Sequence, residues 1–279
     1  MKNKIPGVLK PTLFALVVAG LALFAVQPSL AIGSVPQDAK RSLTPLQLEI
    51  EKQQAKLSSA DPEDRREALV RLRSLRHPDA SRAALLALND PSAVVRTTAA
   101  AAVVSLPLTE VARSLVPLLS DKDEFVRQQV AYALGLKGNT TAIPALIELL
   151  ADKKDSVRGA AAVALGQIGD SQALPGLLAV LNPPALSKKK KAKPEQNVFV
   201  IRAVAHSLGK IGKREASPTL IGLLQDEKAE PDVRREAAIA LGEIRDESAL
   251  AALRAVLSAN DPYLSQSAFD AIKRISTNR

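Results

Sequence analysis

The chain has 279 residues, of which 47% are hydrophobic and only 3% aromatic, and it contains no Cys and no Trp. A chain without Cys cannot form disulfides, thiolate metal sites or a Cys nucleophile, and a core restricted to Leu, Ala, Val and Ile favours close-packed helices over a β-sandwich or barrel. The formal net charge of +9 is uneven, because positions 1–31 contribute +3 and positions 183–196 contribute +4. The rest of the sequence is therefore close to neutral.

The N-terminal residues have the order of a secretory signal peptide. Lys2, Lys4 and Lys10 precede an apolar stretch at residues 13–26, and small residues occupy the −3 and −1 positions of a cleavage site that ends at Ala31. The apolar stretch is shorter than the roughly 20 residues that a membrane-spanning helix needs, so we expect cleavage after Ala31 rather than retention as an anchor. Residues 1–31 thus predict export to the periplasm or an equivalent space, with the thylakoid lumen and secretion as alternatives.

Residues 32–60 are expected to form a linker followed by a capping helix. The first part, residues 32–44, has the composition of a linker, and residues 46–57 are predicted to form a helix that covers the first unit of the domain that follows. The repeat domain itself is predicted to span residues 61–279.

A repeat of constant period dominates this domain. An apolar residue followed by Arg recurs at equal intervals at Arg96, Arg127 and Arg158, and the frame is found again around four further positions. The step from Arg158 to the next Arg of the frame is longer, so one unit contains about 13 extra residues. Periods of roughly 20–50 residues, the range into which this spacing falls, are typical of stacked supersecondary units. The predicted ladder of repeat arginines is Arg65, Arg96, Arg127, Arg158, Arg202 and Arg234, with Ser265 in place of the last Arg.

Each unit is predicted to contain two helices. The first is Ala-rich, as in residues 157–168, and a Gly often follows at its end, where a left-handed residue is favoured. The second is Leu-rich, as in residues 173–181, with Pro175 in its first turn, where a missing N–H breaks no helical bond. A Gly inside the first helix costs about 1 kcal/mol, so we expect it to permit close approach of a neighbouring helix. These interior glycines are Gly135, Gly166, Gly209 and Gly242.

The segments "DSVRGAAAVALGQIGDSQALPGLLAVL" and "PDVRREAAIALGEIRDESALAALRAVL" resemble the HEAT-like repeats of phycobilisome lyases and of many bacterial repeat proteins. The resemblance covers residues 61–279 and implies an all-α fold, an α-solenoid of about six to seven two-helix HEAT-like repeats. It is specific for fold and less so for function, because such repeats occur in scaffolds, lyase subunits and adaptors.

The sequence contains few groups that could perform catalysis. Its two histidines, His77 and His206, fall in different repeats, whereas a catalytic metal normally has three or more protein ligands. The His-Glu pairs of the iron-binding HEAT-like hydroxylases are missing, and no phosphate-binding, dinucleotide-binding or nucleophile motif is present. We therefore expect no metal, no cofactor and no catalytic residues.

Two groups of basic residues could bind an anionic partner. The repeat arginines could form a ladder for an acidic partner, but an Arg near the start of each first helix can instead bond the turn residues Asp90, Asp121 and Asp152 and carbonyls of the adjacent repeat. We favour the structural interpretation, since periodicity follows the fold.

The second group lies in the extra segment of the long repeat, residues 183–196, which is rich in Pro and Lys. It is expected to be a solvated loop, or else an anion-binding finger for acidic lipid or acidic protein. Nucleic acid is disfavoured because the loop has no aromatic residue on which bases could stack. Its lysines are Lys188, Lys189, Lys190, Lys191 and Lys193.

The sequence therefore predicts an exported, non-catalytic scaffold or adaptor that binds a partner protein, an acidic one being one option. The binding surface is expected on the concave side formed by the second helices, with few aromatic anchors. Two alternatives stay open: a bilin lyase or isomerase-like subunit, or chaperone-like factor acting on a pigment protein, and weak association with anionic membrane surfaces through the Lys-rich loop. The oligomeric state is also open. The aromatic residues after the predicted cleavage site are Phe125, Tyr132, Phe199, Tyr263 and Phe269.

Overall fold

The computed structural model describes residues 43–182 and 197–277, and in these ranges the backbone forms 14 α-helices and seven short 3-10 helices, without a strand. The leading helix α1 (Pro45–Lys56) begins at Thr44, whose side chain and that of Gln47 bond each other's backbone N–H groups in a capping box. Helix α1 packs on α2 and α3, and it corresponds to the helix expected at residues 46–57.

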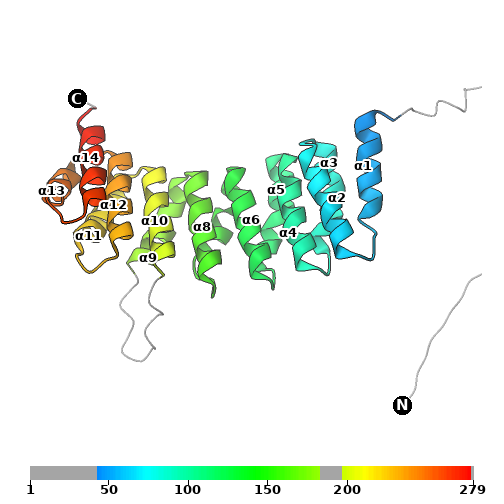
Figure 1. The fold of residues 1–279 in the computed structure, drawn as a ribbon, viewed down its shortest axis with the longest axis horizontal. Coiled ribbons are helices and arrows are strands. Elements are labelled where there is room, and N and C mark those ends of the chain that lie inside the picture. The colour runs from blue at the N-terminus through cyan, green and yellow to red at the C-terminus, as the bar shows by residue number, and fades with distance from the viewer. Residues whose placement is uncertain (1–42, 183–196, 278–279) are drawn as a thin grey trace, which may run out of the picture. The chain divides into compact units, whose positions relative to one another are not determined.

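The remaining helices alternate between a long first helix and a short second helix (Figure 1). The first helices are α2 (Pro62–Ser74), α4 (Ala93–Ala102), α6 (Glu124–Leu136), α8 (Asp155–Ile168), α10 (Val198–Ile211), α12 (Pro231–Ile244) and α14 (Pro262–Ser276). The second helices are α3 (Pro78–Ala84), α5 (Leu108–Leu115), α7 (Ile143–Leu149), α9 (Leu174–Leu181), α11 (Ser217–Gln225) and α13 (Leu250–Ala255). Six helix pairs and a final unpaired first helix therefore make up the described part of the repeat domain, and the predicted all-α solenoid is confirmed.

Each first helix packs directly on the next first helix along the chain, from α2 on α4 to α12 on α14 (Figure 1). The interior glycines allow this close approach. A Cβ added to Gly166 of α8 would lie 2.8 Å from the Cα of Ser207 on α10, and one added to Gly242 would lie 2.8 Å from the Cα of Ala271 on α14. Both distances are too short for a methyl group, so glycine sets the spacing of the first helices, as the sequence predicts.

The helix ends follow the expected turn chemistry. Helices α8 and α10 end at Gly169 and Gly212, whose φ angles of 71° and 69° lie in the left-handed region that favours glycine. Pro175 is in the first turn of α9, preceded by the 3-10 helix η5 (Ser171–Ala173). The same 3-10 lead-in precedes α7, α11 and α13 as η4 (Thr140–Ala142), η6 (Arg214–Ala216) and η7 (Glu247–Ala249).

The core of the repeat domain is aliphatic: its large, fully buried side chains are all Leu or Ile. Across residues 43–182 and 197–277, no helix has both the length and the apolar content that crossing a membrane requires. The same ranges contain no group of three or more His, Cys, Asp or Glu side chains placed to hold a metal ion.

Candidate interaction surface

Three of the repeat arginines form a ladder of ion pairs between consecutive repeats. Arg96 donates two hydrogen bonds of 2.8 Å to the two carboxylate oxygens of Asp121, at the start of the next repeat, and two more to the carbonyls of Asp90 and Pro91. The same bidentate geometry joins Arg65 to Asp90 and Arg127 to Asp152, with N–O distances of 2.7–2.9 Å.

These pairs are buried, and each carboxylate is held in its charged form. Hydrogen bonds from Arg65 hold the pKa of Asp90 below its ordinary value of 3.8. At Asp121, burial raises the pKa, but the hydrogen bonds from Arg96 and from the backbone N–H of Asp123 outweigh it, so that this pKa is also lowered. The hydrogen bonds of these three arginines are therefore made within the fold. Their role is structural, and they do not form a binding site for an acidic partner.

The ladder changes at the long repeat. Arg158 bonds the carboxylate of Asp155 in its own helix and the carbonyl of Asp152. The residue 25 positions further on, where the earlier arginines find their Asp, is Pro183, which lies outside the described residues.

Arg202 is not a member of the ladder, and the predicted frame is shifted there by one residue. The interior glycines Gly166 and Gly209 are equivalent in the two repeats, and counting back from each by the same offset places Ile201 of α10 at the position of Arg158. The side chain of Arg202 is 45% exposed, and among the described residues it reaches only Asp232, at 3.3 Å. The insertion is therefore one residue shorter than the spacing of the arginines suggests.

In α12 the pairing also moves by one residue. Arg234 occupies the ladder position but donates to the carbonyl of Leu224, at 3.0 Å. Its neighbour Arg235 forms the bidentate pair with Asp261, at 3.0 Å to each oxygen, and its guanidinium lies 5.0 Å from the ring centre of Tyr263. Of the two predicted basic groups, the ladder is thus described in full, whereas Lys188, Lys189, Lys190, Lys191 and Lys193 lie outside the described residues.

The two histidines lie apart and make separate local contacts. His77 accepts a hydrogen bond from the backbone N–H of Asp79 at the start of α3, and His206 on α10 contacts Glu236 on α12, with Nδ1 and Oε1 2.9 Å apart. Neither arrangement provides a nucleophile or a set of metal ligands.

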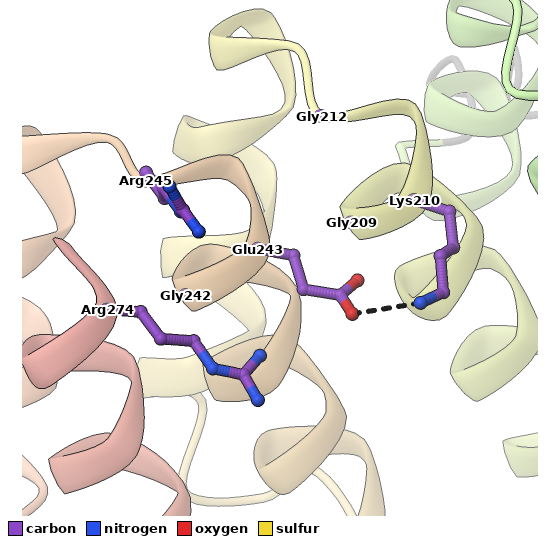
Figure 2. A pocket seen from close by; sticks show the side chains of 7 residues that line it. All are labelled: Gly209, Lys210, Gly212, Gly242, Glu243, Arg245 and Arg274. Carbon is purple, nitrogen blue, oxygen red and sulfur yellow. Dashed lines mark hydrogen bonds and ion pairs between the residues drawn. The ribbon is translucent and has the colours of Figure 1, made fainter. Parts of the chain in front are cut away.

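A charged hollow of about 370 Å³ lies at the C-terminal ends of α10, α12 and α14. Figure 2 shows the side chains of Lys210, Arg245 and Arg274 around the carboxylate of Glu243, which pairs with Lys210 at 3.1 Å. Cations at the last turn of a helix are stabilised by the negative end of the helix dipole. Because Glu243 already supplies a counter-ion in the middle of the hollow, we interpret the cluster as a stabilising feature of the helix ends.

The aromatic side chains form a different kind of surface. All five aromatic residues of the described ranges are exposed, and all lie on first helices: Phe125 and Tyr132 on α6, Phe199 on α10, and Tyr263 and Phe269 on α14. The sequence predicts a binding surface on the second helices, but the described second helices present no aromatic side chain.

Three of these aromatics line one uncharged groove of about 490 Å³ across α6, α8 and α10, which are consecutive in the packing of first helices (Figure 1). One wall is the exposed stripe of α6, with Phe125 and Tyr132 at its ends, and the opposite wall is Phe199 of α10. The remaining lining residues are small or uncharged: Thr97 of α4, Gln128 and Gln129 of α6, and Ser156, Ala160 and Val163 of α8.

Gly159 positions the far wall. A Cβ at this residue would lie 2.1 Å from the Cε1 atom of Phe199, so the ring lies directly over the backbone of α8 at a place that only glycine allows. A cross-helix hydrogen bond of 2.8 Å from Asn197 to Asp155 fixes the start of α10 beside α8. The aromatic wall is therefore held by the fold rather than left as a freely rotating side chain.

These aromatics could be identified from the sequence, but the groove that three of them line could not. Phe125, Phe199 and Tyr263 each stand two residues before the ladder position of α6, α10 and α14, while Ser156 and Asp232 hold this position in α8 and α12. From α6 onward an aromatic occupies this position in every second first helix, whereas α2 has Glu63 there. This signal becomes visible only after the frame of α10 is corrected.

Comparison with known proteins identifies the repeat. The family model described as HEAT repeats matches three overlapping stretches, residues 51–135, 112–192 and 191–273. No curated protein sequence matches.

Among solved structures, the Escherichia coli protein YibA is 22% identical, with 82% of each chain covered and a TM-score of 0.56. An engineered protein from a structural genomics consortium is 22% identical, with 81% of this chain and 68% of that chain covered and a TM-score of 0.50. The complex of CpcE and CpcF of phycocyanin lyase from Nostoc is 23% identical, with 88% of this chain and 99% of that chain covered and a TM-score of 0.49. At these identities the likeness is one of fold alone.

Proposed function

The chain belongs to the HEAT-repeat family, and on this premise we propose that it is a non-catalytic scaffold that holds a partner protein on the exposed surface of its first helices. Solenoids of this kind offer an extended surface in which each repeat contributes a few side chains. The family fold provides the surface, and the side chains on it indicate where binding occurs.

The observation that carries the proposal is the exposure of every described aromatic side chain. Burying an aromatic ring stabilises a fold, so a chain with few aromatics would be expected to use them in its core. Here the core is aliphatic and the five rings face solvent on α6, α10 and α14. Aromatic residues are among the side chains that most often anchor protein interfaces.

The chemistry of the described part supports a binding role over a catalytic one. The buried Arg and Asp side chains of the ladder form ion pairs with each other, and the two histidines have separate local partners. A catalytic site needs a nucleophile, an acid–base pair or a metal with convergent geometry, and the described first-helix surface instead gathers aromatic and amide side chains.

We also propose that the scaffold works outside the cytoplasm, in the periplasm or an equivalent space. Support comes from the order of basic, apolar and small residues in positions 1–31. The partner would then be a resident of the same compartment or the exposed part of an envelope protein.

Affinity capture of the mature protein from its native envelope, followed by mass spectrometry, tests this function. The double variant Phe125→Ser/Phe199→Ser should lose the captured partner, whereas Leu86→Ser, which removes an exposed apolar side chain between α3 and α4, should retain it. A partner that is retained by the double variant would place binding on another surface, and capture of no protein by the wild type would contradict the scaffold function.

A further inference from the structure

The groove across α6, α8 and α10 has a shape and a chemistry that specify its ligand more closely. We infer that it binds an extended peptide segment whose side chains are apolar and uncharged, provided by the partner protein. This inference rests on the proposed scaffold function and names the part of the partner that the surface recognises.

The first argument is charge. Of the nine residues that line the groove, none is charged, although 24% of the residues in the whole chain are. The charges at its N-terminal rim are paired, with Lys154 2.7 Å from Glu124 and Arg158 bonded to Asp155. A charged ligand would lose hydration here without gaining a counter-ion, which is unfavourable. The uncharged lining therefore complements an uncharged ligand.

The second argument is the arrangement of apolar and polar groups. Phe125, Tyr132 and Phe199 provide apolar walls, and the small side chains of α8 provide a floor low enough to admit the ligand between them. Gln128 and Gln129 are half-buried beside this floor, and neither side-chain amide has a partner among the described residues. A carboxamide has both donors and an acceptor, so it matches the N–H and C=O groups of an extended backbone.

The third argument is size. The groove runs from α6 over α8 to α10, two interhelical steps of about 8–10 Å each. An extended chain rises about 3.3 Å per residue, so the groove accommodates roughly five or six residues. A helical ligand would be about 10–12 Å across with its side chains. Two or three side chains of an extended segment fit the groove volume of about 490 Å³ better than a ligand of that width.

Selection from a phage-displayed library of random 12-residue peptides on the full exported chain tests the inference. We expect a consensus of apolar residues without acids or bases, and a synthetic consensus peptide should bind with an affinity that changes less than twofold between low and high salt, because no charges meet. A charged consensus, a strongly salt-dependent affinity or the absence of any enriched peptide would overturn the inference.

Three variants locate the peptide. Phe199→Ala should weaken peptide binding at least tenfold. Gly159→Ala should also weaken it, although Gly159 does not line the groove, because the new methyl group displaces the ring of Phe199. Gln128→Ala combined with Gln129→Ala should weaken binding roughly three- to tenfold, the value of one or two hydrogen bonds. Leu86→Ala is the control, because Leu86 is an apolar side chain that is 70% exposed and lies between α3 and α4, away from the first-helix surface. It should bind as the wild type does.

Two results would show that the groove does not bind an extended peptide segment. A concentration-dependent dimer that Phe199→Ala dissociates would show that a second copy of the chain occupies the groove. A partner protein that depends on Phe125 and Phe199, in a chain that selects no peptide, would leave the scaffold function standing while overturning recognition of an extended segment.

Discussion

Replacement of Arg96 by Met tests whether the ion-pair ladder holds neighbouring repeats together. The change removes four hydrogen bonds, two of 2.8 Å to Asp121 and others of 2.8 and 3.1 Å to the carbonyls of Asp90 and Pro91. Met retains most of the aliphatic side chain. It leaves the carboxylate of Asp121, only 8% exposed, with the backbone N–H of Asp123 as its donor.

Removing one partner of a buried ion pair costs about 3–5 kcal/mol, because the other charge stays buried without compensation. We therefore expect Arg96→Met to lower the free energy of unfolding by about 3 kcal/mol or more. Arg202→Met is the matched control: its single contact of 3.3 Å joins side chains that are half-exposed, and surface pairs contribute about 0–1 kcal/mol. The double variant Arg96→Met/Asp121→Leu should recover much of the loss, since it removes the unpaired carboxylate.

Urea unfolding at neutral pH, followed by the helical circular dichroism signal, measures all three variants. The midpoint for Arg96→Met should fall well below those of the wild type and Arg202→Met. Equal midpoints for the two single variants, or a further loss in the double variant, would refute the structural role of the ladder.

The packing, the charges and the N-terminal sequence support four further predictions. Gly166→Ala should destabilise the protein by about 1–3 kcal/mol in urea unfolding despite the better helix propensity of Ala, because the new Cβ would lie 2.8 Å from the backbone of α10; a gain in stability would contradict the close packing. The lowered pKa of Asp90 contributes stability that is present above its ordinary value of 3.8 and is lost as pH falls through the lower folded value. Urea unfolding midpoints should therefore fall below about pH 4, and they should fall less steeply with pH in Arg65→Met. An equal pH dependence in the wild type and the variant would argue against the ion pair. Replacing residues 185–195 by a short Gly/Ser link should hardly change thermal stability, since loop closure costs only about 0.6 kcal/mol per doubling of length. The same change removes a net charge of +4 and should abolish any sedimentation with anionic liposomes at low salt; unfolding on deletion would show that the segment is part of the core. N-terminal sequencing of the exported protein should begin at Ile32, and an intact Met1 on a membrane-bound form would contradict cleavage.

The repeats could be predicted from the sequence because their signals are local and periodic. The constant spacing of the first arginines, the glycines at helix ends and the prolines in first turns each reflect one helix or one turn, where short-range sterics decide the conformation. The interior glycines were informative for the same reason: their cost within a helix is compensated only by a close neighbour, as Gly166 and Ser207 show.

The predicted position of the ladder arginine is wrong in α10, where the insertion interrupts the repeat period. Ile201 and Arg202 both follow an apolar residue, so a pattern of apolar residue and Arg selected the wrong one. Burial decides the frame, because Val200 is in the core like Val157 of the preceding repeat. The burial of Val200 is visible only once the helices are packed, although the offset from Gly209 in the sequence indicates the same frame.

The groove could not be read from the sequence, because its walls come from distant parts of the chain, Phe125 and Phe199, with the insertion between them. Its floor on α8 is made of small residues that have the same composition as any closely packed helix of the fold. Whether such residues face a neighbouring helix or the solvent depends on the rotation of α8, and Gly159, which holds the ring of Phe199, shows no distinguishing local pattern.

Site-specific photo-crosslinking in the native envelope tests most directly whether the first helices form the binding surface. A photoreactive phenylalanine analogue is placed either at Phe125, on the groove of α6, or at Glu148, an exposed residue of the second helix α7 in the same repeat. A discrete crosslinked partner is expected from position 125 and none from position 148. Crosslinking from position 148 alone would place the binding surface on the second helices and contradict binding by the first helices.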